Sequence, residues 1–362
     1  MSSTESELNQ LRAEIDSLDE QIINLIQKRA GFAKEIGRVK KNSNEPIYRP
    51  DRELDVYEKV SKKSSGPLPA SVIRAIYREM MSGTIALEHP LKIAYLGPEG
   101  SFSFEALRSK FGSSIESVPL PTIADVLRSV DADRVDYGIV PVENSTEGQV
   151  SSTLDMFLET DVLIYSEMYK KIQFSLLGFQ TDINSIQKIY GIRIGNEQCR
   201  SWLSANLPHA EIIETSSTAM AAKTVAELKE GAAVASKIAG EIYGLHVIQE
   251  GIEDVSGNTT RFIVIGKTHC PPTGKDKTSI VFSLANKTGA LFSVLKKFND
   301  HNINLTKIES RPMKKNRWEY NFFIDFIGHK DDERVKTILS SIKAECLEFK
   351  FLGSYPSTDV NQ

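Results

Sequence analysis

The chain has 362 residues, of which 40% are hydrophobic and 25% are charged, and its net charge is −4. This length exceeds the roughly 100 to 200 residues of one ordinary domain, so two or three domains are expected. The sequence has no apolar run of about 18 residues, no secretory signal pattern at its acidic start, and no broad basic face for nucleic acid. Its cysteines, Cys199, Cys270 and Cys346, form no zinc or disulfide motif. We therefore expect a cytoplasmic protein that uses neither membrane, nucleic acid nor metal.

The first ninety residues carry the pattern of helices. A capping-box sequence, Thr4-Glu5-Ser6-Glu7, precedes roughly thirty residues without proline. Apolar residues at steps of three and four form a coiled-coil-like seam, interrupted at Arg29: Leu8, Leu11, Ile15, Leu18, Ile22, Leu25, Phe32, Ile36 and Val39. After Pro46 and Pro50, a second helix is expected over 51–63 and a third that ends near His89. The sequence therefore predicts an all-helical unit over 1–90.

Basic side chains on the long helix indicate an anion site. An arginine in a seam can also fix register or extend into solvent. Lys40 follows Arg29 by eleven residues, which places the two about 20° apart around the helix and about 16 Å apart along it. Both can therefore reach one ligand. Arg12, seventeen residues before Arg29, points about 100° away, so we expect it to act on a partner chain, which implies a dimer.

The helical unit resembles the all-helical chorismate mutases at several short motifs: Leu11-Arg12, Leu18-Asp19, Arg29, Gly37-Arg38-Val39-Lys40, Tyr48-Arg49-Pro50 and Asp51-Arg52-Glu53. The resemblance implies an intertwined dimer of three-helix chains in which Arg12 completes the other subunit's site. It also implies substrate contacts from Arg29, Lys40, Arg52, Glu53, Thr84 and Glu88. Rearranging chorismate to prephenate needs positioning and charge stabilisation rather than a cofactor. Lys40 and a protonated Glu88 would act at the ether oxygen, while Arg49 stands where some members carry an acid.

Over 91–267 the pattern changes to strands that alternate with helices, such as the strands expected at 92–96 and 137–142. This predicts an α/β unit. The glycine turn at 97–103 matches neither a dinucleotide nor a nucleoside triphosphate motif. Polar clusters at 143–148 and 216–219 fall at strand and helix ends, where hydroxyl groups commonly cap helices. The residues alone leave capping and ligand binding open for both clusters.

The α/β unit resembles the prephenate dehydratases over its whole length, at 97–103, 140–145, Gln198-Cys199, 217–219 and Asn258-Thr259-Thr260-Arg261-Phe262. The resemblance implies two lobes with a cleft between them and an essential Thr260. We expect Thr260 to hydrogen-bond the leaving hydroxyl of prephenate, because expelling hydroxide requires a proton donor or a strong hydrogen bond. Phe174 and Ile192-Arg193 depart from the family pattern and leave arogenate open as an alternative substrate. The expected substrate contacts are Ser101, Asn144, Ser145, Gln198, Ser217, Thr218, Thr260, Arg261 and Phe262.

A proline- and glycine-rich linker over 268–274 precedes a third unit over 278–355. Its periodicity predicts the order βαββαβ, a ferredoxin-like arrangement. Segments 286–291 and 303–312 resemble the ACT domain of prephenate dehydratases, although Gly289 and Pro312 also suit a helix start and a strand end. The resemblance implies a phenylalanine site at a domain interface, formed by Gly289, Ala290, Leu291, Asn304, Leu305, Glu309, Ser310, Arg311 and Pro312.

Taken together, the three units resemble the bifunctional chorismate mutase/prephenate dehydratases. The same fold would suit a non-enzymatic amino-acid sensor, or an enzyme in which only one reaction is active. A sensor needs neither the basic residues of the helical unit nor Thr260-Arg261-Phe262. We therefore predict a homodimer or higher homo-oligomer that converts chorismate to prephenate and prephenate to phenylpyruvate. It should require no cofactor and should be inhibited by phenylalanine.

Overall fold

The computed structural model describes residues 3–41, 46–180, 182–313 and 319–358. The chain forms two compact units. The first comprises Met1–Arg49, Val56–Leu91 and Phe111–Ile115, and the second comprises Pro50–Asp55, Lys92–Lys110 and Glu116–Gln362. The expected α/β and C-terminal units therefore share one compact body.

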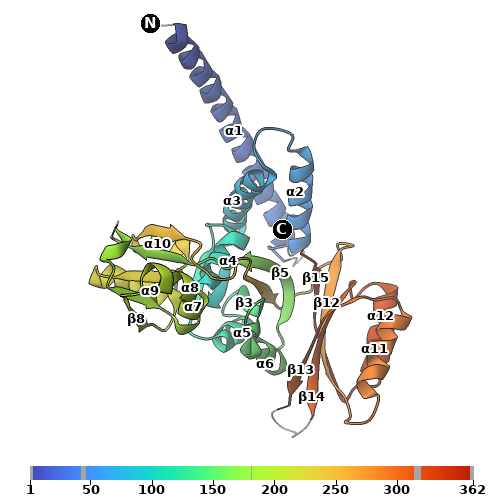
Figure 1. The fold of residues 1–362 in the computed structure, drawn as a ribbon. Coiled ribbons are helices and arrows are strands. Elements are labelled where there is room, and N and C mark those ends of the chain that lie inside the picture. Colours follow the sequence, from blue (N-terminus) through green and yellow to red (C-terminus); the bar gives the residue numbers. More distant parts are fainter. Residues whose placement is uncertain (1–2, 42–45, 181, 314–318, 359–362) are drawn as a thin grey trace. The chain divides into compact units, whose positions relative to one another are not determined.

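The helical part consists of α1 (Ser3–Lys41), α2 (Pro50–Lys63) and α3 (Ala70–Glu88). Pro50 suits the first turn of α2, because a helix start leaves that backbone N–H unpaired in any case. α1 packs against α3, while the N-terminal half of α1 extends beyond it (Figure 1). The nine apolar seam residues of α1 are 48 to 65% exposed. The seam thus has no partner among the described residues of this chain.

The first lobe of the α/β part is a mixed sheet in the order β2-β1-β3-β11-β5, with the short β4 beside β3. β1 runs parallel to β2 and β3, and β11 runs antiparallel to β3 and β5. Its core combines apolar side chains of α5, α6 and the sheet, such as Leu127, Phe157 and Ile263. The elements are β1 (Lys92–Leu96), α4 (Phe102–Phe111), β2 (Glu116–Leu120), α5 (Ile123–Asp131), β3 (Tyr137–Asn144), β4 (Gly148–Gln149), α6 (Ser151–Glu159), β5 (Leu163–Lys171) and β11 (Thr259–Gly266).

The second lobe is a sheet in the order β10-β6-β9-β7-β8. The chain enters it after β5 and returns to the first lobe at β11, so two crossings connect the lobes. Phe174, in the first crossing, is buried and packs edge-on against Phe102 at 5.2 Å between ring centres. The elements are β6 (Ser175–Gly178), η1 (Ile183–Ser185), β7 (Lys188–Gly191), α7 (Arg193–Gln198), α8 (Arg200–Asn206), β8 (Glu211–Glu214), α9 (Thr218–Leu228), β9 (Ala232–Ala235), α10 (Lys237–Tyr243) and β10 (His246–Glu250).

The C-terminal part is an antiparallel sheet in the order β13-β14-β12-β15, with α11 and α12 on one face (Figure 1). The predicted βαββαβ order is confirmed, and Ile280, Phe282 and Ile324 pack with apolar residues of both helices in one buried cluster. Periodicity also predicts that Trp318 shares a strand face with Ile324, but Trp318 lies outside the described residues. The elements are β12 (Asp276–Ser283), α11 (Ala290–Asp300), β13 (Leu305–Pro312), β14 (Tyr320–Ile327), α12 (Glu333–Lys343) and β15 (Glu348–Pro356).

The opposite face of the C-terminal sheet shares a core with the first lobe. Val281, Phe323, Leu352 and Tyr355 join the same buried cluster as Ile164 of β5. Burying large apolar side chains stabilises the folded state by about 1.5 to 3 kcal/mol each, so this contact is a strong one. None of the helices in the described part of the chain combines the length and the hydrophobicity that a membrane span requires.

Candidate active sites

In the helical part, Glu88 lies against α1. It is the last residue of α3, and its carboxyl lies over Gly37, where an added Cβ would approach Glu88 Cγ to 2.6 Å. Glu88 Oε2 is buried and has no hydrogen-bond partner among the described residues. Burial raises the pKa of Glu88 above its ordinary value, although the ammonium group of Lys40 acts in the opposite direction. Sequence alone does not give the direction of this shift, because burial and nearby cations act on a carboxyl pKa in opposite directions.

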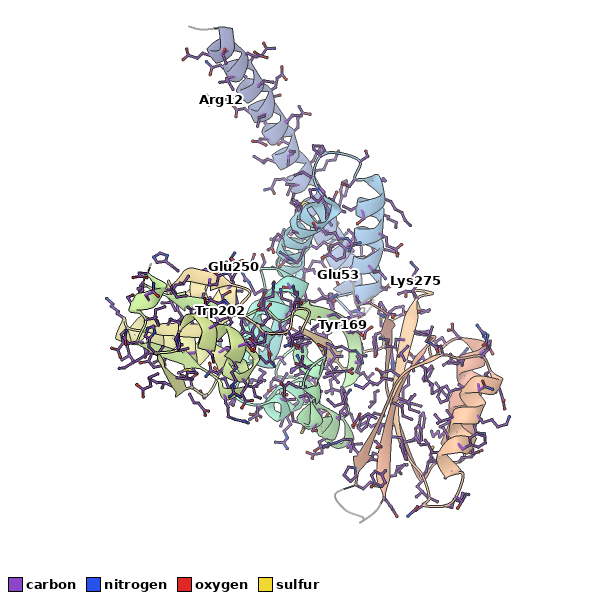
Figure 2. The ribbon with its side chains drawn as sticks, viewed as in Figure 1. Arg12, Glu53, Tyr169, Trp202, Glu250 and Lys275 are labelled. Atoms are coloured by element: carbon purple, nitrogen blue, oxygen red, sulfur yellow. The ribbon has the colours of Figure 1, made fainter. Side chains whose placement is uncertain are left out.

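Arg12 and Arg29 lie on one unbroken helix, α1. Seventeen residues of helix span about 25 Å, so one chain cannot bring both side chains to one small ligand. Figure 2 shows Arg12 on the N-terminal half of α1, where its side chain is exposed, whereas Arg29 is half-buried. Thr84, one turn before Glu88, donates to the carbonyls of Met80 and Met81 at 3.0 Å.

Arg52 and Glu53 lie in the first turn of α2. The exposed Arg52 guanidinium is 3.7 Å from Asp55. Glu53 is largely buried and accepts a 2.8 Å hydrogen bond from the ammonium group of Lys110 on α4. The Glu53 carboxylate therefore has a cationic partner.

In the first lobe, Asn144 and Thr260 of the expected dehydratase site meet a third polar side chain, that of Asn258. Thr260 of β11 pairs with Asn144 at the end of β3. Asn144 Nδ2 donates to Thr260 Oγ1 and to Asn258 Oδ1, both at 2.8 Å. Thr260 and Asn258 are 7% and 4% exposed, so the hydrogen bonds form away from bulk water. Because Thr260 Oγ1 accepts from Asn144, its own proton can point to another acceptor.

The Asn144 side chain is fixed at both ends. Its Oδ1 accepts hydrogen bonds from the backbone N–H groups of Thr146 and Glu147 at 2.9 and 3.0 Å, and from the Thr146 hydroxyl at 2.7 Å. Ser145 Oγ lies 3.4 Å from Asn258 Oδ1 and accepts from the Thr259 N–H at 3.0 Å. The turn after β3 thus orients the amide that holds Thr260.

The second lobe reaches this cluster through Gln198, at the end of α7. Asn258 Nδ2 donates to Gln198 Oε1, and Gln198 Nε2 donates to Glu147 Oε1, both at 3.0 Å. Asn258 thus connects residues of both lobes, although the sequence prediction gave it no role. Its position two residues before Thr260 could have indicated it, because alternate residues of an extended chain share a face.

Other expected contacts in the α/β part have local structural roles. Ser217 caps α9 by accepting from the Met220 N–H at 3.1 Å, and Thr218 begins that helix. Ser101 precedes α4, where its hydroxyl accepts from the Phe104 N–H at 3.2 Å. Phe262 is fully buried in the protein core. Among these groups, only those that remain accessible, such as the N-terminus of α9, can also contact a substrate.

Arg261 does not join Asn144 and Thr260. Side chains of successive strand residues point to opposite faces, and Arg261 extends towards the C-terminal sheet. Its Nε donates to Glu167 at 2.8 Å, its Nη1 to Asp325 at 2.6 Å, and its Nη2 to the Tyr355 hydroxyl at 2.9 Å. Further bonds complete what we call the ion cluster, which consists of Glu167, Arg261, Lys277, Ser279, Asp325 and Tyr355.

The ion cluster is buried and charged. Burial alone would raise the pKa of Asp325, but Arg261 and Lys307 hold that pKa below its usual range. The pKa of Arg261 is correspondingly raised, since Asp325, Tyr355 and Glu167 outweigh its burial. Removing one partner from a buried ion pair commonly costs about 3 to 5 kcal/mol, because the other charge is left uncompensated. The cluster therefore favours one arrangement of the first lobe and the C-terminal sheet.

The residues expected to bind phenylalanine line separate cavities. Ala290 and Leu291 line one of about 330 Å³ beside Tyr320 and Phe322. Gly289 caps α11 with a positive φ of 81°, and Glu309 to Pro312 lie on the edge strand β13. Asn304 lines another cavity, of about 280 Å³.

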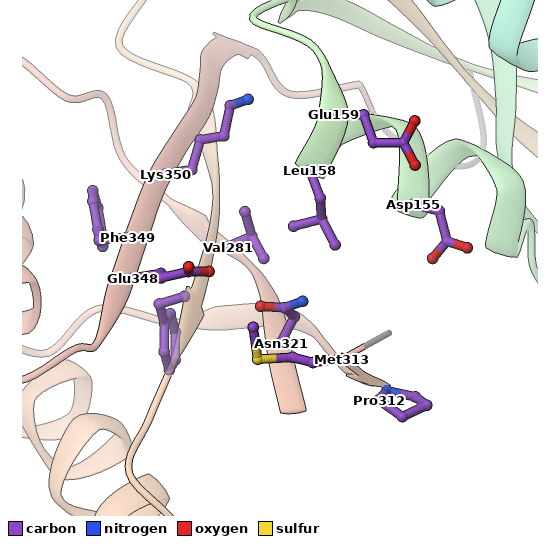
Figure 3. A pocket seen from close by; sticks show the side chains of 11 residues that line it. Asp155, Leu158, Glu159, Val281, Pro312, Met313, Asn321, Glu348, Phe349 and Lys350 are labelled. Carbon is purple, nitrogen blue, oxygen red and sulfur yellow. The ribbon is translucent and has the colours of Figure 1, made fainter. Parts of the chain in front are cut away.

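A further cavity of about 310 Å³ separates the C-terminal sheet from α6 (Figure 3). Pro312 and Met313 lie on one side of it and Asp155, Leu158 and Glu159 on the other. Arg311 Nη2 lies 3.3 Å from Asp155, while its buried Nε has no hydrogen-bond partner among the described residues. The strand that carries the expected effector residues thus contacts α6 of the first lobe.

Three family models match consecutive parts of the chain: chorismate mutase type II over 11–89, prephenate dehydratase over 93–270 and the ACT domain over 278–344. A bifunctional chorismate mutase/prephenate dehydratase of Aquifex aeolicus is 45% identical, covering 97% of this chain and 98% of the relative. One from Stutzerimonas stutzeri is also 45% identical, covering 98% and 99%. A prephenate dehydratase of Arthrobacter aurescens, solved in complex with L-Phe, is 32% identical with a TM-score of 0.68, covering 75% of this chain and 91% of its own.

Proposed function

The chain belongs to the family of bifunctional chorismate mutase/prephenate dehydratases, and from this premise we propose which of its residues perform each reaction. It rearranges chorismate to prephenate and converts prephenate to phenylpyruvate on the route to phenylalanine. The predicted family resemblance, fold class and enzyme type are confirmed. The alternative of a non-enzymatic sensor is not supported.

For the mutase reaction, Lys40 and protonated Glu88 stabilise the negative charge that develops on the ether oxygen as the bond breaks. The raised pKa of Glu88 supports this role, as does its buried Oε2, which has no hydrogen-bond partner in the part of the chain that the structure describes. A bound dianionic substrate would raise that pKa further. Arg29, Arg52 and Arg12 of a second copy bind the two carboxylates, because guanidinium groups pair with carboxylates in a bidentate way. Glu53 and Thr84 complete the substrate contacts.

A homodimer follows from this assignment. The exposed apolar seam of α1 is a suitable surface for the α1 of a second copy. The length of helix between Arg12 and Arg29 supports the same conclusion, since a complete site needs Arg12 from another chain. The location in the cytoplasm stays a prediction from the sequence.

For the dehydratase reaction, Thr260 donates its hydroxyl proton in a hydrogen bond to the ring hydroxyl that leaves prephenate. The observation that supports this is the 2.8 Å bond from Asn144 to Thr260, which occupies an acceptor site of the threonine and leaves its proton for the substrate. As the ring loses carbon dioxide, electrons move towards the departing hydroxyl, and a hydrogen bond there lowers the barrier. Ser145, Gln198 and the N-terminus of α9 hold the rest of the substrate, the helix end favouring a carboxylate.

The paired variants Thr260→Val and Thr260→Ser test this role. Valine keeps the shape of threonine without its hydroxyl, so dehydratase kcat should fall by about 10² to 10³. Serine keeps the hydroxyl and should retain most activity. Mutase activity of both variants serves as the internal control for folding. A Thr260→Val protein that dehydrates prephenate at the wild-type rate would exclude the proposed hydrogen bond.

Phenylalanine regulates the dehydratase through the ACT domain. The support is the L-Phe complex of the Arthrobacter relative and the match of this chain to its fold. We assign Gly289, Ala290 and Leu291 to the effector site with the segment 309–312, and Asn304 and Leu305 as its neighbours.

A further inference from the structure

Thr260 and Arg261 are consecutive residues of β11 that face opposite sides of one sheet. Thr260 pairs with Asn144, and Arg261 pairs with Glu143. The first pair belongs to the proposed dehydratase site, while the second lies on the face that packs against the ACT domain. Any movement of the Arg261 backbone therefore also moves the peptide that carries Thr260.

Three strands of the ACT sheet contribute residues to the ion cluster around Arg261. Asp325 of β14 and Tyr355 of β15 accept its hydrogen bonds, and Ser279 of β12 bonds both of them, at 2.6 and 2.7 Å. Lys277 of β12 contacts Glu167, which also accepts from Arg261. Apolar surfaces can slide past each other, but buried charges lose their partners when displaced. A displacement of the ACT sheet must therefore be accompanied by a movement of Arg261.

The strand β13, which carries residues expected to bind phenylalanine, provides a second connection between the ACT domain and the surroundings of Arg261. Lys307 lies two residues before Glu309 on β13. Its ammonium group is 3.4 Å from the Glu143 carboxylate and 2.5 Å from Gln149 Oε1. Glu143 directly precedes Asn144, and its carboxylate lies 4.0 Å from Arg261. Thr260 carries the proposed reacting hydroxyl, and Asn144 holds it through a hydrogen bond. Each of these two residues thus adjoins a charged residue bonded to the ACT domain.

We propose that Arg261 is a positioning residue through which the ACT domain controls the orientation of Thr260. This inference rests on the proposed roles of Thr260 and of phenylalanine. Phenylalanine binding changes the ACT sheet, the ion cluster follows because its charges stay paired, and the Thr260 hydroxyl leaves its productive orientation. Effector binding and catalysis are then linked by one coupling free energy.

The variant Tyr355→Phe tests the inference, because it removes one hydroxyl from the ion cluster and keeps the buried ring. Tyr165→Phe is the matched control, since Tyr165 is an equally buried tyrosine of β5 that stacks on Tyr137 at 5.5 Å and is not a member of the ion cluster. For each protein we would measure dehydratase kcat/KM without and with saturating phenylalanine, and phenylalanine affinity by calorimetry. The ratio of the two kcat/KM values reports the coupling.

For Tyr355→Phe, the ratio of kcat/KM without phenylalanine to kcat/KM with phenylalanine should fall towards one, by about threefold or more. Phenylalanine should still bind to this variant. Tyr165→Phe should keep the wild-type ratio. If Tyr355→Phe does not fold, Ser279→Ala provides the same readout, because Ser279 bonds both Asp325 and Tyr355. An unchanged ratio in the folded variant overturns the role of Arg261. A wild-type protein that binds phenylalanine without inhibition overturns the proposed regulation itself.

Discussion

At the scale of single residues, Glu88 is the proposed proton-bearing group of the mutase site. Its raised pKa means that the protonated form persists above the ordinary pH range of a glutamate. Mutase kcat/KM should stay high at low pH and decline as the pH rises through this raised pKa, because a carboxylate cannot donate. Glu88→Gln should flatten the decline and retain activity, since an amide donates at every pH. Identical pH profiles for the two proteins would exclude Glu88 as the donor.

Gly37 is expected to position Glu88, because a Cβ at residue 37 would occupy the space of the Glu88 carboxyl. Gly37→Ala should lower mutase kcat/KM by about 10²-fold through this displacement. Alanine is a better helix former by about 1 kcal/mol, so the loss should occur without a drop in Tm. Gly31→Ala is the matched control, since an added Cβ there meets nothing within 4 Å. Equal activities of the two alanine variants would contradict the positioning role.

What the sequence could predict of the sites differs from residue to residue. The motif around Thr260 identified the dehydratase strand, but it grouped Arg261 with Thr260 although strand geometry separates their side chains. Asn258 was overlooked because its role depends on contacts with residues more than fifty positions away. The direction of the Glu88 pKa shift depends on burial against α1, which sequence periodicity does not give.

At the scale of elements, α1 is expected to serve two active sites. Arg12→Ala and Arg29→Ala should each be nearly inactive as a mutase. Mixed and allowed to exchange subunits, they should recover about a quarter of the wild-type activity, because half of the dimers are mixed and each has one intact site. A mixture of Arg12→Ala with an Arg12→Ala/Arg29→Ala double variant is the control and should recover nothing. Mixed dimers of the two single variants that stay inactive would contradict the shared site.

Helices and strands were well predicted where one face is buried. The third unit shows this, since its alternating and 3.6-residue patterns correspond to β12, α11, β14 and α12. The second face of the same sheet was not predicted to have a partner. Val281 and Phe323 could have indicated it, because apolar residues on both faces of a strand are typical of a sheet covered on both sides.

At the scale of the whole molecule, the ACT domain is expected to contribute both regulation and stability. Deleting residues 273–362 removes none of Asn144, Asn258 and Thr260, and Arg261 keeps Glu167 as its partner, so the dehydratase should remain active and lose its response to phenylalanine. The deletion also removes four buried side chains from the shared core. The truncated protein should therefore unfold at a lower temperature, by about 2 to 4 °C for each kcal/mol lost. Continued inhibition by phenylalanine in this protein would place the effector site elsewhere.

One chain is expected to carry two separate active sites for consecutive reactions. To test this, we would supply the purified protein with chorismate alone and follow chorismate, prephenate and phenylpyruvate by chromatography. The wild-type protein should consume chorismate and form phenylpyruvate, whereas Thr260→Val should accumulate prephenate. Arg29→Ala should leave chorismate unchanged and still convert added prephenate. Loss of both reactions in either folded variant, or no phenylpyruvate from the wild-type protein, would contradict two separate sites on one chain.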